Sequence, residues 1–388
     1  MIHDRIEQFV TKSAERSMRG PVAAHREDGE EHREFDELAL AVFAHQYEHV
    51  PLYRRLCELR GIQPGDVSLW RDIPAAPADL FKEQELVADG SPAVRTFASS
   101  GTTQGPERPS RHILGERDLA LYRRSSLAHF AAMAMPDSPG PMTVILLGPG
   151  AATHPSSSLG HMYQFVIEEF GCRETSSTAL FDAAGTLDAG GAIESLERAA
   201  AGTRPVLLLS LRSTITAVIE ALRDRRLALR LPADSRLVHT GGNKGGRTMS
   251  RAGILKAAWR FLHIPSYHCI EEYGMTELLS QFYDVALRSR WSGRNDARSL
   301  VGPAWTRTLV VDPATLSPVG PGERGILRHF DLANCGSVSA VQTLDLGVQA
   351  GRGFDVLGRA SGAEARGCSQ LLSGLSGSIS GEKESGLS

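Results

Sequence analysis

A loop rich in glycine and small hydroxyl residues occupies positions 99–106, where the sequence reads SSGTTQGP. Glycine lets the backbone approach an anion closely, and consecutive amide N–H groups can form a nest around phosphate oxygens. The residues that this pattern puts forward as phosphate ligands are Ser99, Ser100, Gly101, Thr102, Thr103 and Gly105. The alternative is an ordinary surface turn, and the spacing of a Walker A loop is absent.

A second glycine-rich loop, VHTGGNKGG at 238–246, follows an apolar stretch. Gly241 and Gly242 would let a flat ring lie against the backbone, and Lys244 is a candidate cation for an anionic ligand. Taken alone, this loop is better explained as a glycine-rich turn.

The third loop, YGMTE at 273–277, combines an aromatic ring, a hydroxyl group and a carboxylate. Tyr273 could stack on a base, Thr276 could bind a phosphate oxygen, and Glu277 could hold Mg²⁺. Alternatively, Thr276 caps a helix and Glu277 lies in the first turn of that helix. Three such loops in this order favour a nucleotide site over three unrelated turns.

The elements that must position these loops alternate along the chain from about residue 94. The expected strands are 94–98, 142–148, 205–211 and 236–242. The expected helices are 116–135, 158–170, 191–201, 213–226 and 250–262. Apolar strands that alternate with amphipathic helices predict an α/β domain with a largely parallel sheet. Ligands of such sheets usually lie beyond the carboxyl ends of the strands.

The two ends of the chain have a different pattern. Apolar residues between 35 and 43 recur at helical spacing and predict a helical N-terminal region over residues 1–90. After residue 300 the sequence predicts strands, with hairpin turns at 312–325 and 349–353. Residues 373–388 are small, polar and low in complexity, so we expect a disordered tail there.

The composition excludes several classes of function. The 388 residues carry a net charge of only −3, which gives no electrostatic reason to bind nucleic acid or an anionic membrane. No apolar run approaches the ~20 residues that span a bilayer, and the first residues do not read as a secretory signal. The five cysteines are scattered without CxxC spacing, which argues against disulfides and zinc. We therefore expect a cytoplasmic protein.

The motifs together resemble those of a known superfamily. SSGTTQGPERP, the glycine pair at 241–242, YGMTE, TLDLG at 343–347 and GRASGAEARG at 358–367 resemble, in order, the motifs of the adenylate-forming acyl- and aryl-CoA ligases. Within that superfamily, residues 35–370 are most similar to the acyl-protein synthetase (LuxE-like) branch. The resemblance implies an adenylate-forming fold with a large N-terminal domain of sheets flanked by helices and a much shortened C-terminal domain.

This resemblance also implies a division of the chain. The adenylation domain would span residues 1–357, including the helical region over residues 1–90 and a β-rich region at 300–357. A truncated C-terminal piece would follow at 358–372, and the tail at 373–388.

The reaction that the resemblance implies has two halves. A carboxylate attacks the α-phosphorus of ATP, giving an acyl-adenylate and pyrophosphate, and a thiol then attacks the activated carbonyl. The residues that match the ATP-binding motifs are Ser99, Ser100, Gly101, Thr102, Thr103, Gly105, Gly241, Gly242, Tyr273, Gly274, Met275, Thr276, Asp345 and Arg359. By matched position, Tyr273 would stack on adenine, and Asp345 would hold the ribose hydroxyls with Arg359 near the same sugar. Thr276 would contact the α-phosphate, and Glu277 would carry Mg²⁺.

The chain departs from the superfamily pattern in two places. The phosphate loop ends in Pro-Glu-Arg-Pro where Pro-Lys is typical, so Arg108 or Arg111 is a candidate for the missing basic group. Few residues follow Arg359, so we expect no C-terminal domain of the usual length with its catalytic lysine. Lys244 is the candidate catalytic cation in its place.

Two further stretches bear on the acyl group. In acyl-protein synthetases the acyl group passes to a cysteine near the C-terminus and then to a partner reductase. Cys368 suits that role because the guanidinium of Arg366 would favour its thiolate, although it could equally be a packing residue. The loop at 148–162 could form the mouth of the acyl pocket, with His154 or His161 near the carboxylate. Alternatively, it is a strand–helix connection capped by Ser157 or Ser158.

The leading interpretation is an ATP-dependent acyl-protein synthetase that activates a carboxylic acid, with a fatty acid favoured. An acyl- or aryl-CoA ligase similar to the phenylacetate-CoA ligases is the alternative, and it predicts turnover that depends on CoA and survives Cys368→Ser. A third interpretation is a non-enzymatic scaffold for a reductase, which would not bind ATP.

Overall fold

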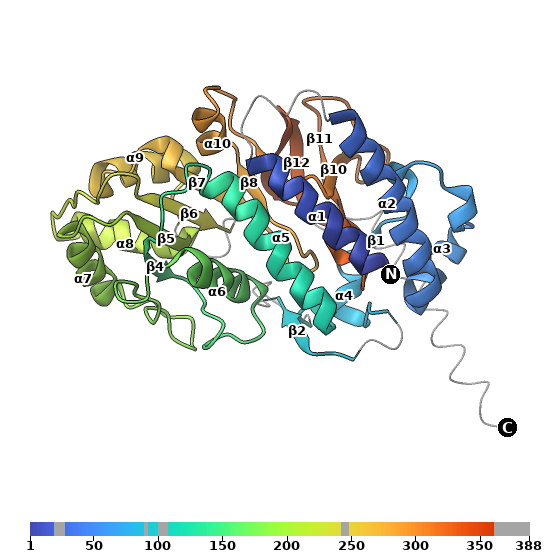
Figure 1. The fold of residues 1–388 in the computed structure, drawn as a ribbon, viewed down its shortest axis with the longest axis horizontal. Coiled ribbons are helices and arrows are strands. Elements are labelled where there is room, and N and C mark those ends of the chain that lie inside the picture. Colours follow the sequence, from blue (N-terminus) through green and yellow to red (C-terminus); the bar gives the residue numbers. More distant parts are fainter. Residues whose placement is uncertain (19–27, 89–91, 100–107, 242–247, 361–388) are drawn as a thin grey trace.

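The computed structural model describes residues 1–18, 28–88, 92–99, 108–241 and 248–360. Within these ranges the N-terminal region is mostly helical up to Leu59, while residues 60–88 are mostly loops and turns with short elements, so the helical region predicted over residues 1–90 is found only in part. α1 (Ile2–Met18) lies along α5 (Glu116–Ala134), and α2 (Asp28–His49) leads directly into α3 (Pro51–Leu59) (Figure 1). Proline is well tolerated in the first turn of a helix, so Pro51 separates α2 from α3 without a long linker.

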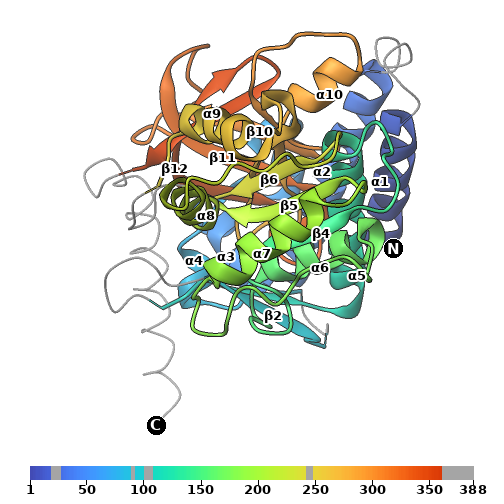
Figure 2. The same ribbon diagram turned by 90° about the vertical axis from the view of Figure 1, so that its left-hand side faces the viewer.

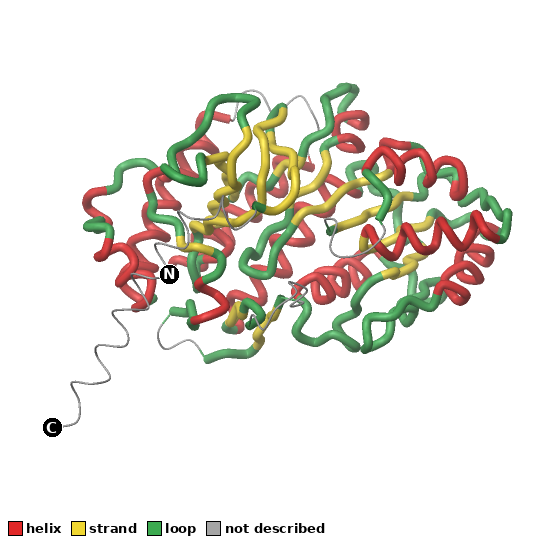
Figure 3. The backbone as a smooth tube through the Cα atoms, turned by 180° about the vertical axis from the view of Figure 1, so that it is seen from behind, coloured by secondary structure: helices red, strands yellow, loops and turns green. Residues whose placement is uncertain are grey.

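One large sheet runs through the molecule (Figures 1 and 3), in the strand order β10-β11-β12-β13-β9-β8-β7-β6-β5-β4. Its parallel portion consists of β4 (Thr143–Leu147), β5 (Val206–Leu211), β6 (Arg236–Thr240) and β7 (Cys269–Tyr273). The prediction of a parallel sheet is therefore confirmed for the expected strands at 142–148, 205–211 and 236–242, while the strand expected at 94–98 lies outside this sheet.

Helices cover both faces of the parallel strands (Figure 2). Along β4, Val144 and Leu146 pack on the side of α5 and α6 (Ser158–Phe170). Ile145 and Leu147 pack on the opposite side, among residues of α7 (Ala189–Ala200), α8 (Arg212–Asp224) and α9 (Arg251–Leu262). Because successive side chains of a strand point to opposite faces, a strand buried on both faces reads as a continuous apolar run.

The remainder of the sheet is antiparallel apart from one short strand. It consists of β8 (Phe282–Asp284), β9 (Leu300–Val301), β10 (Thr306–Val311), β11 (Arg324–Asp331), β12 (Ala340–Ala350) and β13 (Gly353–Arg359). The predicted turns at 312–325 and 349–353 join β10 to β11 and β12 to β13. β1 (Ala76–Pro77) pairs with β12 in parallel, and α10 (Ala286–Trp291) connects β8 to β9.

A separate two-stranded sheet is formed by β2 (Arg95–Ala98) and β3 (Arg111–Leu114). The amide of Ala98 donates to the carbonyl of Ser156 at 2.8 Å, which ties this hairpin to the loop before α6. The other short elements are α4 (Leu80–Glu83), η1 (Pro64–Asp66), η2 (Trp70–Asp72), η3 (Ser266–His268) and η4 (Leu332–Asn334).

The helical N-terminal region is joined to the sheet by buried polar contacts. The side-chain amide of Gln46 in α2 donates to the carbonyl of Asn334 at 2.8 Å and accepts from the Ser339 hydroxyl at 2.9 Å. In the described ranges no helix is both long enough and apolar enough to cross a membrane. The division at residues 357 and 372 stays a prediction, because the described portion of the chain ends at residue 360.

Candidate active site

The hydroxyl of Tyr273, at the end of β7, donates to Asp345 Oδ2 of β12 at 2.8 Å. The Tyr273 ring is held by Phe282, His329 and Phe354, whose ring centroids lie 5.6 to 5.9 Å from its own. Burial and the neighbouring Asp345 raise the pKa of Tyr273 well above its usual value, so the hydroxyl stays protonated and donates. The site residues predicted at 273 and 345 are thus brought together.

Arg359 lies on β13 directly opposite Asp345 of β12, in the register of the antiparallel pair. Its side chain is exposed, and its positive charge acts to lower the pKa values of both Tyr273 and Glu277. An exposed cation and a carboxylate at one strand end could bind a polar ligand such as a sugar.

The segment after Tyr273 is a turn in which the amide of Leu278 donates to the carbonyl of Met275 at 3.2 Å. The interpretation of Thr276 as a helix cap is therefore wrong, since no helix begins there. A Cβ at Gly274 would lie 2.7 Å from Glu272 Oε1, so a larger residue here would require the buried Glu272 side chain to move. Met275 and Thr276 are partly buried.

Glu277 is buried beside the base of the first loop. Burial raises its pKa, a hydrogen bond with the Ser110 side chain lowers it, and the charge of Asp345 raises it further. A divalent cation next to this carboxylate would offset the cost of burying its charge and the repulsion from Asp345. The donor set therefore fits Mg²⁺, whose preferred ligands are oxygen atoms.

The two ends of the first loop are joined by hydrogen bonds between Ser99 and Ser110. The Ser99 amide donates to the Ser110 carbonyl at 3.0 Å, and the Ser110 amide donates to Ser99 Oγ at 3.0 Å. Two residues further, Nδ1 of the buried His112 lies 2.9 Å from the Thr276 carbonyl oxygen. The base of the first loop thus lies beside the third loop.

The basic candidates at the end of the first loop have different surroundings. Arg108 is exposed, and Arg111 Nη2 lies 3.6 Å from Glu85 Oε1. Several predicted site residues lie outside the described residues: Ser100, Gly101, Thr102, Thr103, Gly105, Gly242, Lys244 and Cys368.

Gly241 directly follows β6 and is exposed, with φ of +96°. Glycine adopts this backbone conformation without the strain that a Cβ would bring. The bend therefore lies at the carboxyl end of β6, next to the strand that carries Tyr273.

The two predicted pocket histidines lie in and after the loop that follows β4. His154 Nδ1 is 2.9 Å from the Thr153 hydroxyl, and His161 Nε2 is 3.0 Å from the Pro155 carbonyl. Burial lowers the pKa of His161, so this ring is neutral at pH 7 and donates to the carbonyl. Ser157 caps α6 by accepting from the Gly160 amide at 3.0 Å, which supports the choice of Ser157 over Ser158 as the cap.

The sequence interpretation misses three polar groups of this region. His112 and Ser110 are not singled out, because the pattern of the first loop lies in its glycines and hydroxyls and ends before them. Glu272 precedes Tyr273 directly and is buried, with its pKa raised to about 7, chiefly by burial. A carboxylate at the end of an apolar strand is the signal that could have identified it.

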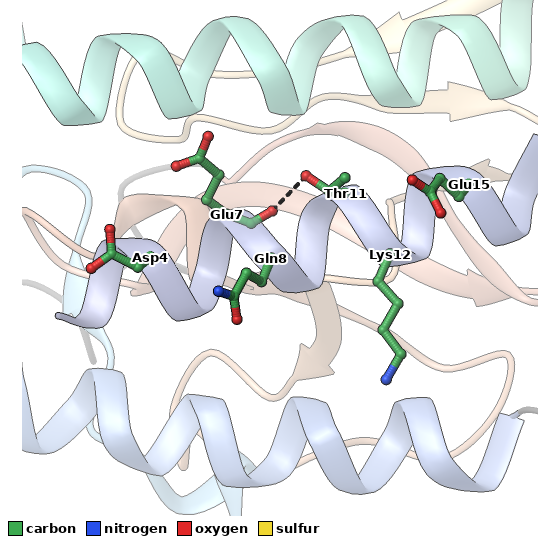
Figure 4. Close-up of a pocket in the computed structure, with 6 residues that line it drawn as sticks. All are labelled: Asp4, Glu7, Gln8, Thr11, Lys12 and Glu15. Atoms are coloured by element: carbon green, nitrogen blue, oxygen red, sulfur yellow. Dashed lines mark hydrogen bonds between the residues drawn. The ribbon is translucent and has the colours of Figure 1, made fainter.

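A shallow hollow over α1 is separate from these loops (Figure 4). Its lining residues are Asp4, Glu7, Gln8, Thr11, Lys12 and Glu15. Their charged groups pair with neighbouring helices, as in the contact of Lys12 Nζ with Glu34 Oε2 at 3.0 Å. This hollow is explained as a charged helix surface.

The comparison with known proteins agrees with this arrangement. A family model described as acyl-protein synthetase, LuxE, matches residues 20–375. No curated protein sequence matches the chain.

Among solved structures, the chain is similar to a 2-hydroxyisobutyryl-CoA ligase. In an open conformation with 2-HIB-AMP and CoA that ligase is 15% identical, with a TM-score of 0.59 over 84% of this chain and 75% of that chain. In its postadenylation state with 2-HIB-AMP it is 15% identical, with a TM-score of 0.61 over 84% of this chain and 67% of that chain. At this identity the likeness establishes the shared fold, and it confirms the prediction of an adenylate-forming architecture.

Proposed function

The chain belongs to the LuxE acyl-protein synthetase family, and we propose that it activates a carboxylic acid with ATP and transfers the acyl group to a thiol. The observation that carries the proposal is the meeting of three motifs distant in sequence. Tyr273 bonds to Asp345, and the hairpin base at Ser99 and Ser110 lies beside Thr276 and Glu277.

In the first half-reaction, the substrate carboxylate attacks the α-phosphorus of ATP and pyrophosphate leaves with the electron pair of the broken P–O bond. Displacement at phosphorus depends mainly on positioning and on neutralising charge. Asp345 would accept from the ribose hydroxyls, and Tyr273 would both orient Asp345 and stack on adenine. Thr276 would donate to the α-phosphate.

The triphosphate would lie on the loop between Ser99 and Ser110, with the N–H groups and hydroxyls of residues 100–105 as donors. Glu277 would hold Mg²⁺, which when bound neutralises charge that develops on the phosphates. Lys244 is the proposed further cation at this end of the site. Arg359, opposite Asp345 in register, would lie near the ribose.

In the second half-reaction, a thiolate attacks the adenylate carbonyl, AMP leaves, and a thioester forms. We propose Cys368 as that thiol, since the guanidinium of Arg366, two residues earlier, would favour its thiolate. The acyl group would then pass to a partner reductase. Residues 1–357 would form the adenylation domain, with 358–372 as a short piece that carries the acceptor and 373–388 as a tail.

The family resemblance favours a fatty acid as the substrate, held near His154 and His161. Both histidines lie in the segment between β4 and the first turn of α6, close in sequence to the Ser156 carbonyl that contacts the first hairpin. A cytoplasmic location would supply ATP and Mg²⁺ and keep the acceptor cysteine reduced.

Intact-protein mass spectrometry tests this proposal. The protein is incubated with ATP, Mg²⁺ and a panel of fatty, aryl and polar acids without CoA. The expected result is a gain of one acyl group, which hydroxylamine removes and which Cys368→Ser abolishes while Cys172→Ser retains it. Pyrophosphate release that starts only on addition of CoA would contradict the cysteine acceptor and favour a CoA ligase.

A further inference from the structure

Glu272 and Tyr273 are consecutive residues at the end of β7, and their side chains point to opposite faces of the sheet. On one face, Glu271 pairs with Arg212 and Arg251. On the other face, Glu272 lies on the same side as Ile270 and Val238, which pack in the core beneath α5 and α6. Glu272 is therefore a carboxylate at the ligand edge of the sheet, on the face away from the Glu271 ion pairs.

Tyrosine side chains surround this carboxylate. Burial first, and the charge of Glu272 second, raise the pKa values of Tyr122, Tyr163 and Tyr283. The hydroxyls of two of them already have other acceptors, since Tyr122 donates to the Ser158 carbonyl at 2.9 Å and Tyr163 to the Ser210 carbonyl at 3.1 Å. These hydroxyls therefore do not satisfy Glu272.

Two buried acceptor atoms remain at this place. Glu272 has one hydrogen bond, with the Thr240 side chain, and that bond acts to lower its pKa. Among the described residues, its Oε2 atom and Gln281 Oε1 have no hydrogen-bond partner. The two side chains are neighbours, because a Cβ at Gly274 would lie 2.7 Å from Glu272 Oε1 and 3.7 Å from Gln281 Cγ. Both residues are at least 95% buried, at 4% and 5% exposure. An unpaired buried carboxylate oxygen is costly, so its retention needs an explanation.

The position of Glu272 and Gln281 relative to the proposed ATP site explains why these unpaired acceptors are kept. Tyr273, Gly274 and Met275 separate Glu272 from Thr276, which would contact the α-phosphate. The substrate carboxylate must reach that phosphorus, so the portion of the acid next to its carboxyl group would lie within a few ångströms of the turn. Glu272 and Gln281 are the buried acceptors at that turn.

We propose that Glu272, with Gln281, accepts a hydrogen bond from a hydroxyl or ammonium group on the acyl portion of the substrate, so that the enzyme selects a polar acid over an unsubstituted fatty acid. This inference rests on the proposed acid activation. It concerns only which acid the enzyme activates, and it replaces the fatty acid that the family resemblance favours with a polar acid. The tyrosine rings would provide apolar and aromatic walls around a compact acyl group, while the two oxygens fix its polar substituent.

The size of the expected preference follows from the chemistry. A site built to hydrogen-bond a substrate group rejects the analogue that lacks it strongly, because its own buried acceptors are then left unpaired. We expect the polar acid to exceed its unsubstituted analogue by roughly 100-fold or more in kcat/KM. A hydrophobic pocket would show the reverse preference.

The test is acid-dependent exchange of pyrophosphate into ATP, measured with acids that differ in one group. Suitable sets are hexanoate, 2-hydroxyhexanoate and norleucine, and benzoate with its hydroxy and amino derivatives; tetradecanoate represents a fatty acid. In the native protein we expect the hydroxy or amino acid of each set to support faster exchange than the unsubstituted acid of that set. Glu272→Leu should lower the ratio of exchange with the polar acid to exchange with the unsubstituted acid to within about tenfold. Exchange with the unsubstituted acid should be kept, which shows that the variant is folded.

A second variant distinguishes the two donors. Glu272→Gln keeps the shape of the side chain and removes its charge. It should therefore largely retain exchange with the hydroxy acid and lose exchange with the amino acid. Asp345→Asn is the matched control, because it should slow exchange with every acid and leave the ratios within a set unchanged.

Preference for tetradecanoate or for the unsubstituted members in the native protein would overturn this inference and leave acid activation intact. Unchanged ratios in Glu272→Leu would also overturn it. Absence of exchange with every acid would instead overturn the proposed function, and this inference with it.

Discussion

His112 Nδ1 of β3 lies 2.9 Å from the carbonyl oxygen of Thr276, 164 positions later in the chain. This contact joins the hairpin that carries the first glycine-rich loop to the turn after β7. Since burial lowers the pKa of His112 to about 4, the ring is neutral at pH 7 and its Nδ1–H donates. Two of the motifs that define the proposed site are therefore held in a fixed relation by one hydrogen bond.

His112→Phe keeps the ring volume and removes this donor. We expect the KM for ATP to rise by about fivefold, the equivalent of about 1 kcal/mol for one hydrogen bond. Steady-state pyrophosphate release at varied ATP concentration measures it. His129 is another buried histidine, and it bonds to the Val301 carbonyl and not to this turn, so His129→Phe is the matched control. Equal effects of the two changes on KM would contradict a role for His112 in positioning.

Tyr273→Phe removes the donor to Asp345 and keeps the ring. The stacking surface survives but Asp345 loses its orientation, so KM for ATP should rise by roughly fivefold and kcat should change less. Tyr53 donates to the Pro74 carbonyl at 2.6 Å in the helical region, so Tyr53→Phe should affect stability and leave KM unchanged. An unchanged KM in Tyr273→Phe would show that Asp345 needs no support from this hydroxyl.

Gly274→Ala places a methyl group 2.7 Å from Glu272 Oε1. Overpacking of this kind costs about 1–3 kcal/mol, so we expect exchange activity to fall by about tenfold or more. Measured with an unsubstituted acid, which needs no acceptor at Glu272, the double variant with Glu272→Ala should recover some of the loss, because the clash partner is removed. Gly65→Ala, where nothing lies within 4 Å of the new methyl group, is the control. Failure of the double variant to recover any activity would contradict the steric explanation.

The buried histidines predict that stability falls in mild acid. Burial lowers the pKa values of His112 and His129 to about 4 and of His239 and His329 to about 3. Below the unfolded-state pKa of about 6.5, the unfolded chain binds protons that the folded chain does not, so stability is lost as pH falls.

Four carboxyl groups oppose this trend. Burial raises the pKa values of Glu272 to about 7 and Asp331 to about 6, and it also raises those of Glu277 and Asp284, so the folded chain binds more protons there as pH falls. Burial also lowers the pKa values of three further histidines, His45, His161 and His268. In the described part of the chain seven such histidines stand against four such carboxyls, which leaves a net loss, and we expect Tm to decrease from pH 7 to pH 5. A Tm that stays constant or rises over this range, measured by calorimetry, would contradict the histidine assignment.

Arg236, the first residue of β6, is fully buried and forms an ion pair with Asp137. It donates to both oxygens of Asp137, at 2.9 and 2.8 Å, and to the Ala134 carbonyl at 2.6 Å. Asp137→Ala leaves this guanidinium without its counter-charge, so we expect the free energy of unfolding in urea to fall by about 3 kcal/mol. Exposed Asp66→Ala should lower it far less. Equal effects would show that the buried pair adds nothing to stability.

The sequence predicted the strands and helices around the site because their apolar patterns are local. β4 to β6 and the helices α5 to α9 fall within a few residues of the expected ranges, whereas β7 was not among the expected strands. Thr276 had two local explanations, a phosphate ligand or a helix cap, and only the three-dimensional turn separates them.

The contacts that assemble the site could not be read from one sequence. Tyr273 and Asp345 are 72 positions apart, and no periodicity links them. Strand alternation predicts that Glu272 points away from the face of Tyr273. It does not reveal that α5 and α6 bring Tyr122 and Tyr163 to that face, because helix packing depends on the whole core.

The central claim is that these loops form a site that adenylates an acid. Exchange of labelled pyrophosphate into ATP, without CoA and across the acid panel, tests it most directly. We predict exchange that requires one class of acid and Mg²⁺ and that falls by about tenfold or more in Asp345→Ala, with Tyr53→Phe unaffected. ATP that binds without supporting exchange for any acid, or exchange that is unchanged in Asp345→Ala, would contradict the account.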